Sequence, residues 1–347
     1  MKYKSLFLSI PLLCLVACSS NDDIEEVEKA PKRPIRVEVS EIPMIDSLAD
    51  NTGVKRAPIT TVSSLEEFYM NYYYEGDFST SYLWTHEIQK PGGVWVWAPQ
   101  IGTAAWPQGA GNNPVTFYAY AGADWGQQGE EGPCYLDEED GKVKLDFSMD
   151  ENPEKTKDLL VSKDVKSYSQ DGTIHFTFRH ACAAMQFTIC KTAKLENVEV
   201  KVKEIKIHHL VNNAQYIFDD ENPWDLSNEY SDYTIKAYTP EQSSGSIIVG
   251  PEPAVLVGDG TNDYVFAIPQ TITPWSGTGP LSNTYAEIVC SIKKGDTQYA
   301  KEDPDNDGFG SVYIPFTVPQ LKQGFVHHVK IIMGTALKKN DGTSIFK

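Results

Sequence analysis

The feature that most constrains the fold of this chain is a series of short segments in which apolar and polar residues alternate. In IRVEVSEI, residues 35–42, Ile35, Val37 and Val39 alternate with charged or polar residues. A period of two places every second side chain on one face, as in a β-strand with one buried face. Similar or continuously apolar segments recur between turn residues, among them GGVWVWAP, PVTFYAYAG, GKVKLDFSM, GTIHFTFRH, AAMQFTICK, YVFAIPQTI and FVHHVKIIMG. This density of segments predicts an all-β protein built from β-sandwiches.

The polar stretch KTAKLEN, residues 191–197, separates two clusters of these segments and is the expected domain boundary. The divisions we predict are a tether plus first strand over 19–56, an N-terminal β-sandwich over 57–193 and a C-terminal β-sandwich with a terminal strand over 194–347.

Two local features depart from plain alternation. In NVEVKVKEIKIHHLV the apolar phase shifts by one residue, which predicts a β-bulge near Lys203–Glu204. The best candidate for a helix is SSLEEFYMNYY, Ser63 to Tyr73.

The first 18 residues have the pattern of an export leader. Lys2 and Lys4 precede the apolar run SLFLSIPLLCLVA, which is too short to span a bilayer as a stable helix. The run ends in LVAC, which resembles a lipobox, so we expect residues 1–18 to be a lipoprotein signal peptide and Cys18 to carry the lipid. The alternative is an ordinary signal peptide that contains a cysteine. The acidic tract SSNDDIEE that follows resembles those that send lipoproteins to the outer surface in Bacteroidetes.

Charge and motifs exclude two classes of function. The formal net charge is −18, which repels phosphate backbones and argues against a nucleic-acid partner. The sequence contains no G-x-S-x-G, H-E-x-x-H or phosphate-binding glycine loop, and we expect no enzymatic activity.

One segment is a candidate calcium-binding loop. In DPDNDG, Asp303, Asp305 and Asp307 with Gly308 match the start of a calcium-binding loop. The twelfth position is Ile314 rather than Glu, so the alternative is a solvated acidic turn. Apart from the lipid on Cys18, no other cofactor is expected.

The remaining metal and thiol candidates favour structural roles. The adjacent pairs His208–His209 and His327–His328 lie on predicted strands, where neighbours point to opposite faces and cannot chelate one metal together. No C-x-x-C pair occurs, so we interpret the four cysteines outside the leader as buried free thiols: Cys134, Cys182, Cys190 and Cys290.

Four tryptophans leave an alternative function open. Trp95, Trp97, Trp106 and Trp125 could form a stacking platform for sugars on a surface glycan-binding lipoprotein. Tryptophans of β-sandwiches are more often part of the core, and we favour that interpretation.

Four segments, in order, resemble the hallmarks of one family. They are AAWP with VTFYAYAG, KDLLVSKDV with GTIHFTFRHACAAMQFTI, YVFAIPQTIT and LKQGFVHHVKIIM. The second carries Asp158, Leu159 and Leu160, followed by Phe178 and His180. In the fourth, the usual aromatic and Pro-Gly lead-in is reduced to Lys-Gln-Gly. Behind a lipobox, this combination resembles the Bacteroidales fimbrillin family, the subunits of type V pili and related surface adhesins.

The resemblance implies two transthyretin-like β-sandwich domains in tandem and a surface pilus subunit or adhesin in the outer membrane. Subunits of this family travel to the surface as lipoproteins, and an Arg-specific protease then cuts after the first strand. A strand from another subunit fills the groove that the first strand leaves. The implied partners are other pilus subunits, the Arg-specific surface protease, the outer membrane through the lipid, and a host or bacterial surface ligand.

Arg56 is the best match to the cleavage site that the resemblance implies. The other three arginines are Arg33, which precedes proline, and Arg36 and Arg179, which lie in predicted strands. We therefore predict cleavage between Arg56 and Ala57, with an ordinary surface arginine as the alternative. The removable strand would carry Ile35, Val37, Val39 and Ile42.

The C-terminal segment GTALKKNDGTSIFK, residues 334–347, is the positional candidate for a donor strand. It is short, and a turn is expected at Asn340–Gly342. These features favour a tip or accessory subunit over a stalk subunit.

Overall fold

The computed structural model describes residues 35–46, 62–74, 85–98, 114–123, 132–149, 157–167, 172–236, 245–256, 264–300 and 308–346. Within these ranges the chain forms β-strands and three single turns of 3-10 helix, with no α-helix, which confirms the all-β prediction. The 3-10 turns are η1 (Val62–Ser64), η2 (Pro91–Gly93) and η3 (Ala193–Leu195). No helix in this part of the chain is long and apolar enough to cross a membrane.

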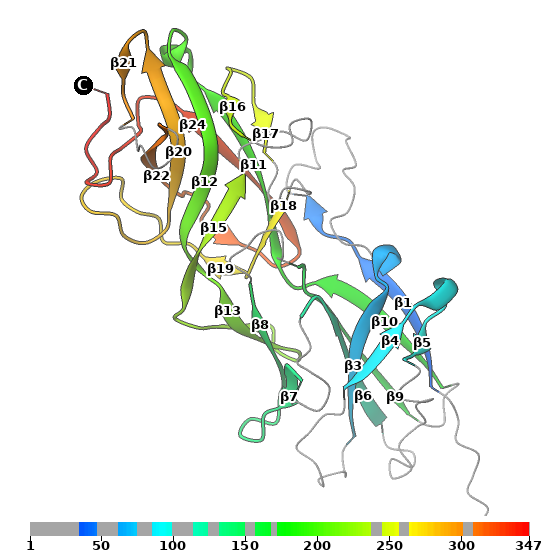
Figure 1. Cartoon of the computed structure of the whole chain (residues 1–347). Coiled ribbons are helices and arrows are strands. Elements are labelled where there is room, and N and C mark those ends of the chain that lie inside the picture. The colour runs from blue at the N-terminus through cyan, green and yellow to red at the C-terminus, as the bar shows by residue number, and fades with distance from the viewer. Residues whose placement is uncertain are drawn as a thin grey trace, which may run out of the picture.

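The largest sheet has seven strands and occupies the lower right of Figure 1. Its order is β1-β10-β9-β6-β3-β4-β5, and β1 is parallel to β10 whereas every other neighbouring pair is antiparallel. The strands are β1 (Arg36–Ile42), β3 (Glu67–Tyr74), β4 (His86–Gln89), β5 (Val96–Trp97), β6 (Pro114–Ala121), β9 (Leu160–Ser167) and β10 (Thr173–His180).

A four-stranded sheet joins the two halves of the sequence, because two of its strands come from each half. Its order is β14-β13-β8-β7, and all its pairs are antiparallel. The strands are β7 (Cys134–Leu136), β8 (Val143–Ser148), β13 (Asn213–Ile217) and β14 (Trp224–Leu226).

Two further sheets, one with five strands and one with six, form the upper part of the molecule (Figure 1). One has the path β17-β11-β24-β2 with β18 also on β11; the other has the path β15-β12-β20-β21 with β16 on β12 and β22 on β20. The strands of the first are β2 (Ile45–Asp46), β11 (Ala183–Lys191), β17 (Ala254–Val255), β18 (Tyr264–Ala267) and β24 (Phe325–Met333). The strands of the second are β12 (Glu199–Val211), β15 (Tyr230–Lys236), β16 (Ile247–Ile248), β20 (Tyr285–Lys294), β21 (Thr297–Gln298) and β22 (Gly310–Pro315). A two-stranded ladder of β19 (Gln270–Thr271) and β23 (Gln320–Leu321) completes the fold.

The pairing of β11 is relevant to the position of the domain boundary. The expected boundary at 193/194 assigns β11 to the N-terminal domain, yet β11 pairs with β17, β18 and β24, which all follow that boundary. Strand pairing changes between β10 and β11, at Ala181–Cys182. The division at 193/194 stays a prediction, and the pairing favours a boundary at Ala181–Cys182.

Buried apolar side chains form two separate clusters. The larger one, the main core, runs through both halves and includes Tyr120, Tyr216, Phe187 and Ile288. The smaller one, the aromatic cluster, lies on one face of the seven-stranded sheet. It is made of Ile35, Val62, Phe68, Met70, Ile88, Val115, Phe117, Ala119, Ala121, Leu160, Ile174, Phe176 and Phe178. The seven-stranded sheet is therefore buried on both faces.

The structure corrects one local prediction and confirms another. Ser63–Tyr73 was expected to be helical, but only η1 is a helical turn there and Glu67–Tyr74 is strand β3. Its aromatic residues favour a strand, and pairing with β4 and β6 on both sides fixes it. The bulge is confirmed, because the register of β12 against β20 shifts between Val202 and Glu204.

We predict that Gly122, just after β6, cannot be replaced by alanine without a large loss of stability. Its φ is +91°, and an added Cβ would lie 2.1 Å from the backbone oxygen of Asp158. Gly141 is the matched control, because its φ is +69° and nothing lies within 4 Å of an added Cβ. The positive φ alone should cost each alanine variant roughly 1–2 kcal/mol. In urea denaturation, the free energy of unfolding of G122A should fall by about 2 kcal/mol more than that of G141A, because the clash forces the backbone to move. Equal losses in the two variants would contradict this account.

Candidate functional site

The candidate site is the position of β1 at the edge of the seven-stranded sheet, where β1 lies along β10 (Figure 1). The parallel register runs from Arg36 opposite Thr173 to Ile42 opposite Arg179. Among the described residues β1 has a ladder partner on one side, so its other edge is not paired with a strand. A strand held by one ladder can be exchanged without breaking the rest of the sheet.

The side chains of β1 and of the residue before it alternate between the aromatic cluster and solvent. Ile35 is 3% exposed and belongs to the cluster, while Val37 and Val39 are half-buried and pack against it. Full burial of a side chain the size of Ile35 is worth about 1.5–3 kcal/mol. Ile42 lies in β1 but is 55% exposed, because it stands one residue out of phase with these positions. The inward position at this end of the strand belongs to Glu41.

The groups against which β1 lies are here called the strand seat. They are its register partners on β10, Ile174, Phe176 and Phe178, and the groups that contact its ends, Trp97, Val62 and His180. Phe176 and Phe178 point inward from alternate positions of β10 and make edge contacts with Phe68, at centroid distances of 5.8 and 5.2 Å. The aromatic segment TIHFTFRH therefore supplies the floor of the seat through its own period-two pattern.

Polar contacts hold both ends of β1. At its start, Trp97 Nε1 of β5 donates a hydrogen bond of 3.2 Å to the carbonyl of Ile35. Because β5 is the opposite edge of the same sheet, the sheet rolls until its two edges meet. At the end of β1, the Val62 amide of η1 donates a hydrogen bond of 2.7 Å to Glu41 Oε2.

A buried histidine lies beside Glu41. His180 ends β10, its side chain is 1% exposed, and its Nδ1 hydrogen-bonds the fully buried carboxylate of Asp158. Its Nε2 lies 3.7 Å from Glu41 Oε1. Burial lowers the pKa of His180, but the hydrogen bond and charge of Asp158, together with Glu41, outweigh burial and raise this pKa above its ordinary value. The sequence placed Asp158 and His180 in a motif, but it did not indicate that Glu41 would meet them.

The segment that carries β1 also reaches the next sheet. Ile45 and Asp46 form β2, which pairs in parallel with Phe325 and Val326 of β24. The Ile45 amide donates a hydrogen bond of 2.8 Å to the carbonyl of Gly324. Residues 35–46 thus bind the edges of two sheets.

The tryptophans that suggested a sugar platform are partly buried and pack against the aromatic cluster where the structure describes them. Trp95 packs edge-on to Phe68 at 5.0 Å, and Trp97 packs edge-on to His86 at 5.1 Å. These contacts favour the packing interpretation for Trp95 and Trp97. Trp106 and Trp125 lie outside the described residues, as do Cys18, Arg56, Ala57, Asp303, Asp305 and Asp307.

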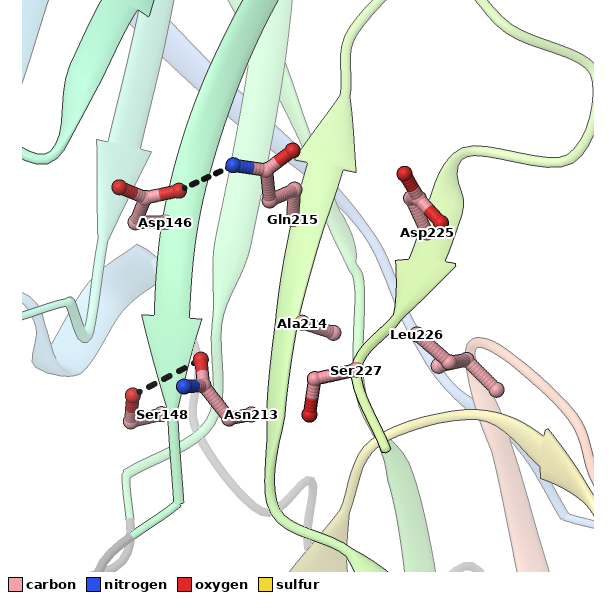
Figure 2. A pocket seen from close by; sticks show the side chains of 8 residues that line it. All are labelled: Asp146, Ser148, Asn213, Ala214, Gln215, Asp225, Leu226 and Ser227. Atoms are coloured by element: carbon pink, nitrogen blue, oxygen red, sulfur yellow. Dashed lines mark hydrogen bonds between the residues drawn. The ribbon is translucent and has the colours of Figure 1, made fainter. Parts of the chain in front are cut away.

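A surface depression of about 570 Å³ lies on the four-stranded sheet (Figure 2). Its polar side chains largely bind one another: Gln215 donates to Asp146 at 2.9 Å, and Ser148 donates to Asn213 at 3.3 Å. Asp225, Leu226 and Ser227 form the opposite wall. None of the eight lining residues is aromatic or cationic, and the depression holds no nucleophile–base pair.

The adjacent histidines His208 and His209 contact different neighbours. His208 lies between Asp232 and Glu287, 2.8 Å from each, whereas His209 stacks on Tyr230. No group of three or more His, Cys, Asp or Glu in the described ranges is arranged to hold a metal ion. The four cysteines listed above are buried free thiols.

Comparisons with known proteins agree with this architecture. A family model described as fimbrillin-like matches residues 77–345. A solved fimbrial protein from Bacteroides vulgatus ATCC 8482 has 16% identity and a TM-score of 0.51, over 90% of this chain and 97% of that one. A “putative cell adhesion protein” from Bacteroides ovatus ATCC 8483 has 11% identity and a TM-score of 0.45, over 87% and 92% of the two chains. No curated protein sequence matches the chain. The family match points to a structural protein rather than an enzyme.

We predict that acid weakens the rim of the strand seat through His86. This residue of β4 stacks on Tyr72 at 5.5 Å, and in the described structure neither of its ring nitrogens has a hydrogen-bond partner. Burial lowers its pKa from 6.5 to about 4. The unfolded chain therefore binds a proton more readily than the folded chain, and stability is lost as the pH falls from about 6.5 towards 4.

Urea denaturation at pH 7 and pH 5 should show a loss of about 2 kcal/mol that depends on His86. The variant H86F keeps an aromatic ring but cannot titrate. Its free energy of unfolding should therefore fall by about 2 kcal/mol less than that of the wild type between pH 7 and pH 5. An unchanged pH dependence in H86F would contradict the prediction.

Proposed function

Because the chain belongs to the fimbrillin-like family, we propose that it is a cell-surface fimbrial subunit or adhesin that assembles by strand exchange at the seat of β1. In this proposal an Arg-specific protease cuts between Arg56 and Ala57, the segment before the cut leaves, and a strand of another subunit replaces β1. The observation that carries the proposal is that β1 is an edge strand over the aromatic cluster, with one ladder partner in the described structure.

The chemistry of the emptied seat supports replacement rather than collapse. Loss of β1 would leave the outer edge of β10 without its ladder and would expose Phe176 and Phe178. Unpaired backbone groups beside an apolar surface are a template for an added strand. The main core contains none of the three inward apolar side chains Ile35, Val37 and Val39. From the departing segment it would lose the partly buried Met44 and the two-residue ladder of β2 on β24.

The beginning of the chain supplies the remaining parts of the proposal. A lipid on Cys18 would hold the uncut chain at the outer membrane, on the cell surface where the protease acts. Removal of residues 1–56 would then release the subunit to other pilus subunits, and a host or bacterial surface molecule would be the ligand of the assembled adhesin. The position and surroundings of Arg56 in the sequence support this order of events.

The C-terminal segment supports a tip or accessory position. Leu337 is 1% exposed and Ile345 is 8% exposed, so both are anchored in the main core. Lys338 makes isolated β-bridges to Tyr313 and Ser344, which fold the segment back on its own chain. A segment held this way is a poor donor strand for a neighbour.

Replacing Arg56 should block maturation. In a Bacteroides host, mass spectrometry of surface fractions should find the wild-type chain starting at Ala57 within high-mass assemblies. The R56Q variant should remain uncut and unassembled, while K55Q, with the same charge change one residue away, should mature normally. Assembly of R56Q, or a wild-type chain found only in its lipidated, uncut form, would refute protease activation.

A further inference from the structure

We propose that the strand seat selects its incoming strand by a carboxylate at the position of Glu41, and that this contact also fixes the strand's register. The inference rests on the proposed function, because it describes which strand can replace β1.

Glu41 is the one residue of β1 that is both charged and turned inward. Of the seven residues of this strand, Arg36 and Glu38 are also charged, but both are exposed. The Glu41 side chain is 16% exposed and stands opposite Phe178 in the register. Its two oxygens face different groups: Oε2 accepts the Val62 amide at 2.7 Å, and Oε1 lies 3.7 Å from His180 Nε2.

His180 favours a carboxylate at the position of Glu41. Its side chain is 1% exposed, and Asp158 fixes the ring through Nδ1. In the described structure Nε2 has no hydrogen-bond partner and depends on the nearby charge of Glu41. An apolar residue at position 41 would take the acceptor from the part-buried Val62 amide and would remove the carboxylate that faces this nitrogen. The loss of the amide's acceptor alone costs about 1–3 kcal/mol.

The same contact sets the register. A shift of one residue would turn every inward side chain of the strand outward. A shift of two would keep the apolar alternation but would bring a valine or a residue beyond the strand to His180. Apolar side chains of similar size tolerate such a shift, whereas the carboxylate does not.

The incoming strand should therefore carry three apolar residues at alternating positions, followed two residues later by Asp or Glu. Residues 35–41 have this pattern, with Ile35, Val37, Val39 and Glu41. The segment 334–346 does not contain it, and its Leu337 is already buried in the main core. The expected occupant is thus an acidic strand from a different kind of subunit rather than the C-terminal segment of a second copy.

Peptide exchange into the cut chain tests the proposal. The full chain is cut once after Arg56, as verified by mass, and mixed with a fluorescent peptide of residues 35–42. Anisotropy then compares this peptide with its Glu41→Gln and Glu38→Gln variants. The two variants carry the same charge change, but Glu38 faces solvent, where its ion pair with His175 is worth little.

We expect the Glu41→Gln peptide to bind roughly 5- to 100-fold more weakly, and the Glu38→Gln peptide to bind as the parent does. In an H180Q chain the ratio of the dissociation constants of the Glu41→Gln peptide and the parent peptide should fall towards one. Equal binding of both peptides to the wild-type seat overturns the inference and leaves strand exchange standing. If no peptide enters the seat, strand exchange itself is refuted, and the inference fails with it.

Discussion

The N-terminal half of this molecule depends on the meeting of two edges of one sheet. The seven-stranded sheet curls around an aromatic cluster, and it closes where Trp97 of β5 hydrogen-bonds the carbonyl of Ile35 ahead of β1. Without that closure the inner faces of Phe68, Phe176 and Phe178 would be open to water on one side. The strand that closes the roll, β1, precedes all the other strands of the described chain.

The division into two apolar clusters separates the packing of β1 from that of the main core. The apolar side chains of β1 pack in the smaller cluster, whereas the larger cluster ties the four-stranded sheet to the upper sheets. Met44, just beyond β1, packs against the larger cluster from its margin. Loss of β1 would therefore be a local event, and the polar contacts of Glu41 at the end of the strand decide how well a substitute fits.

The sequence predicted the parts of this design that depend on local pattern. Period-two alternation identified β1 and β10, and a change of phase located the bulge in β12. It did not predict pairing between distant segments, such as β11 with β24, because alternation fixes which face is buried but not which strand lies alongside. The same limit applies to the site. In the sequence Glu41 is an ordinary polar residue, and its proximity to His180 follows only from the parallel register of β1 against β10.

The parallel pairing of β1 with β10 has a mechanical consequence. Tension applied to the chain ahead of Ile35, along the strand, pulls β1 lengthwise past β10, so all hydrogen bonds of the ladder share the load. A strand pulled away sideways from one end would instead lose its bonds one after another. The short ladder of β2 on β24 lies further along the same segment and extends this resistance to a second sheet. Tension along this segment therefore loads two ladders that belong to two different sheets.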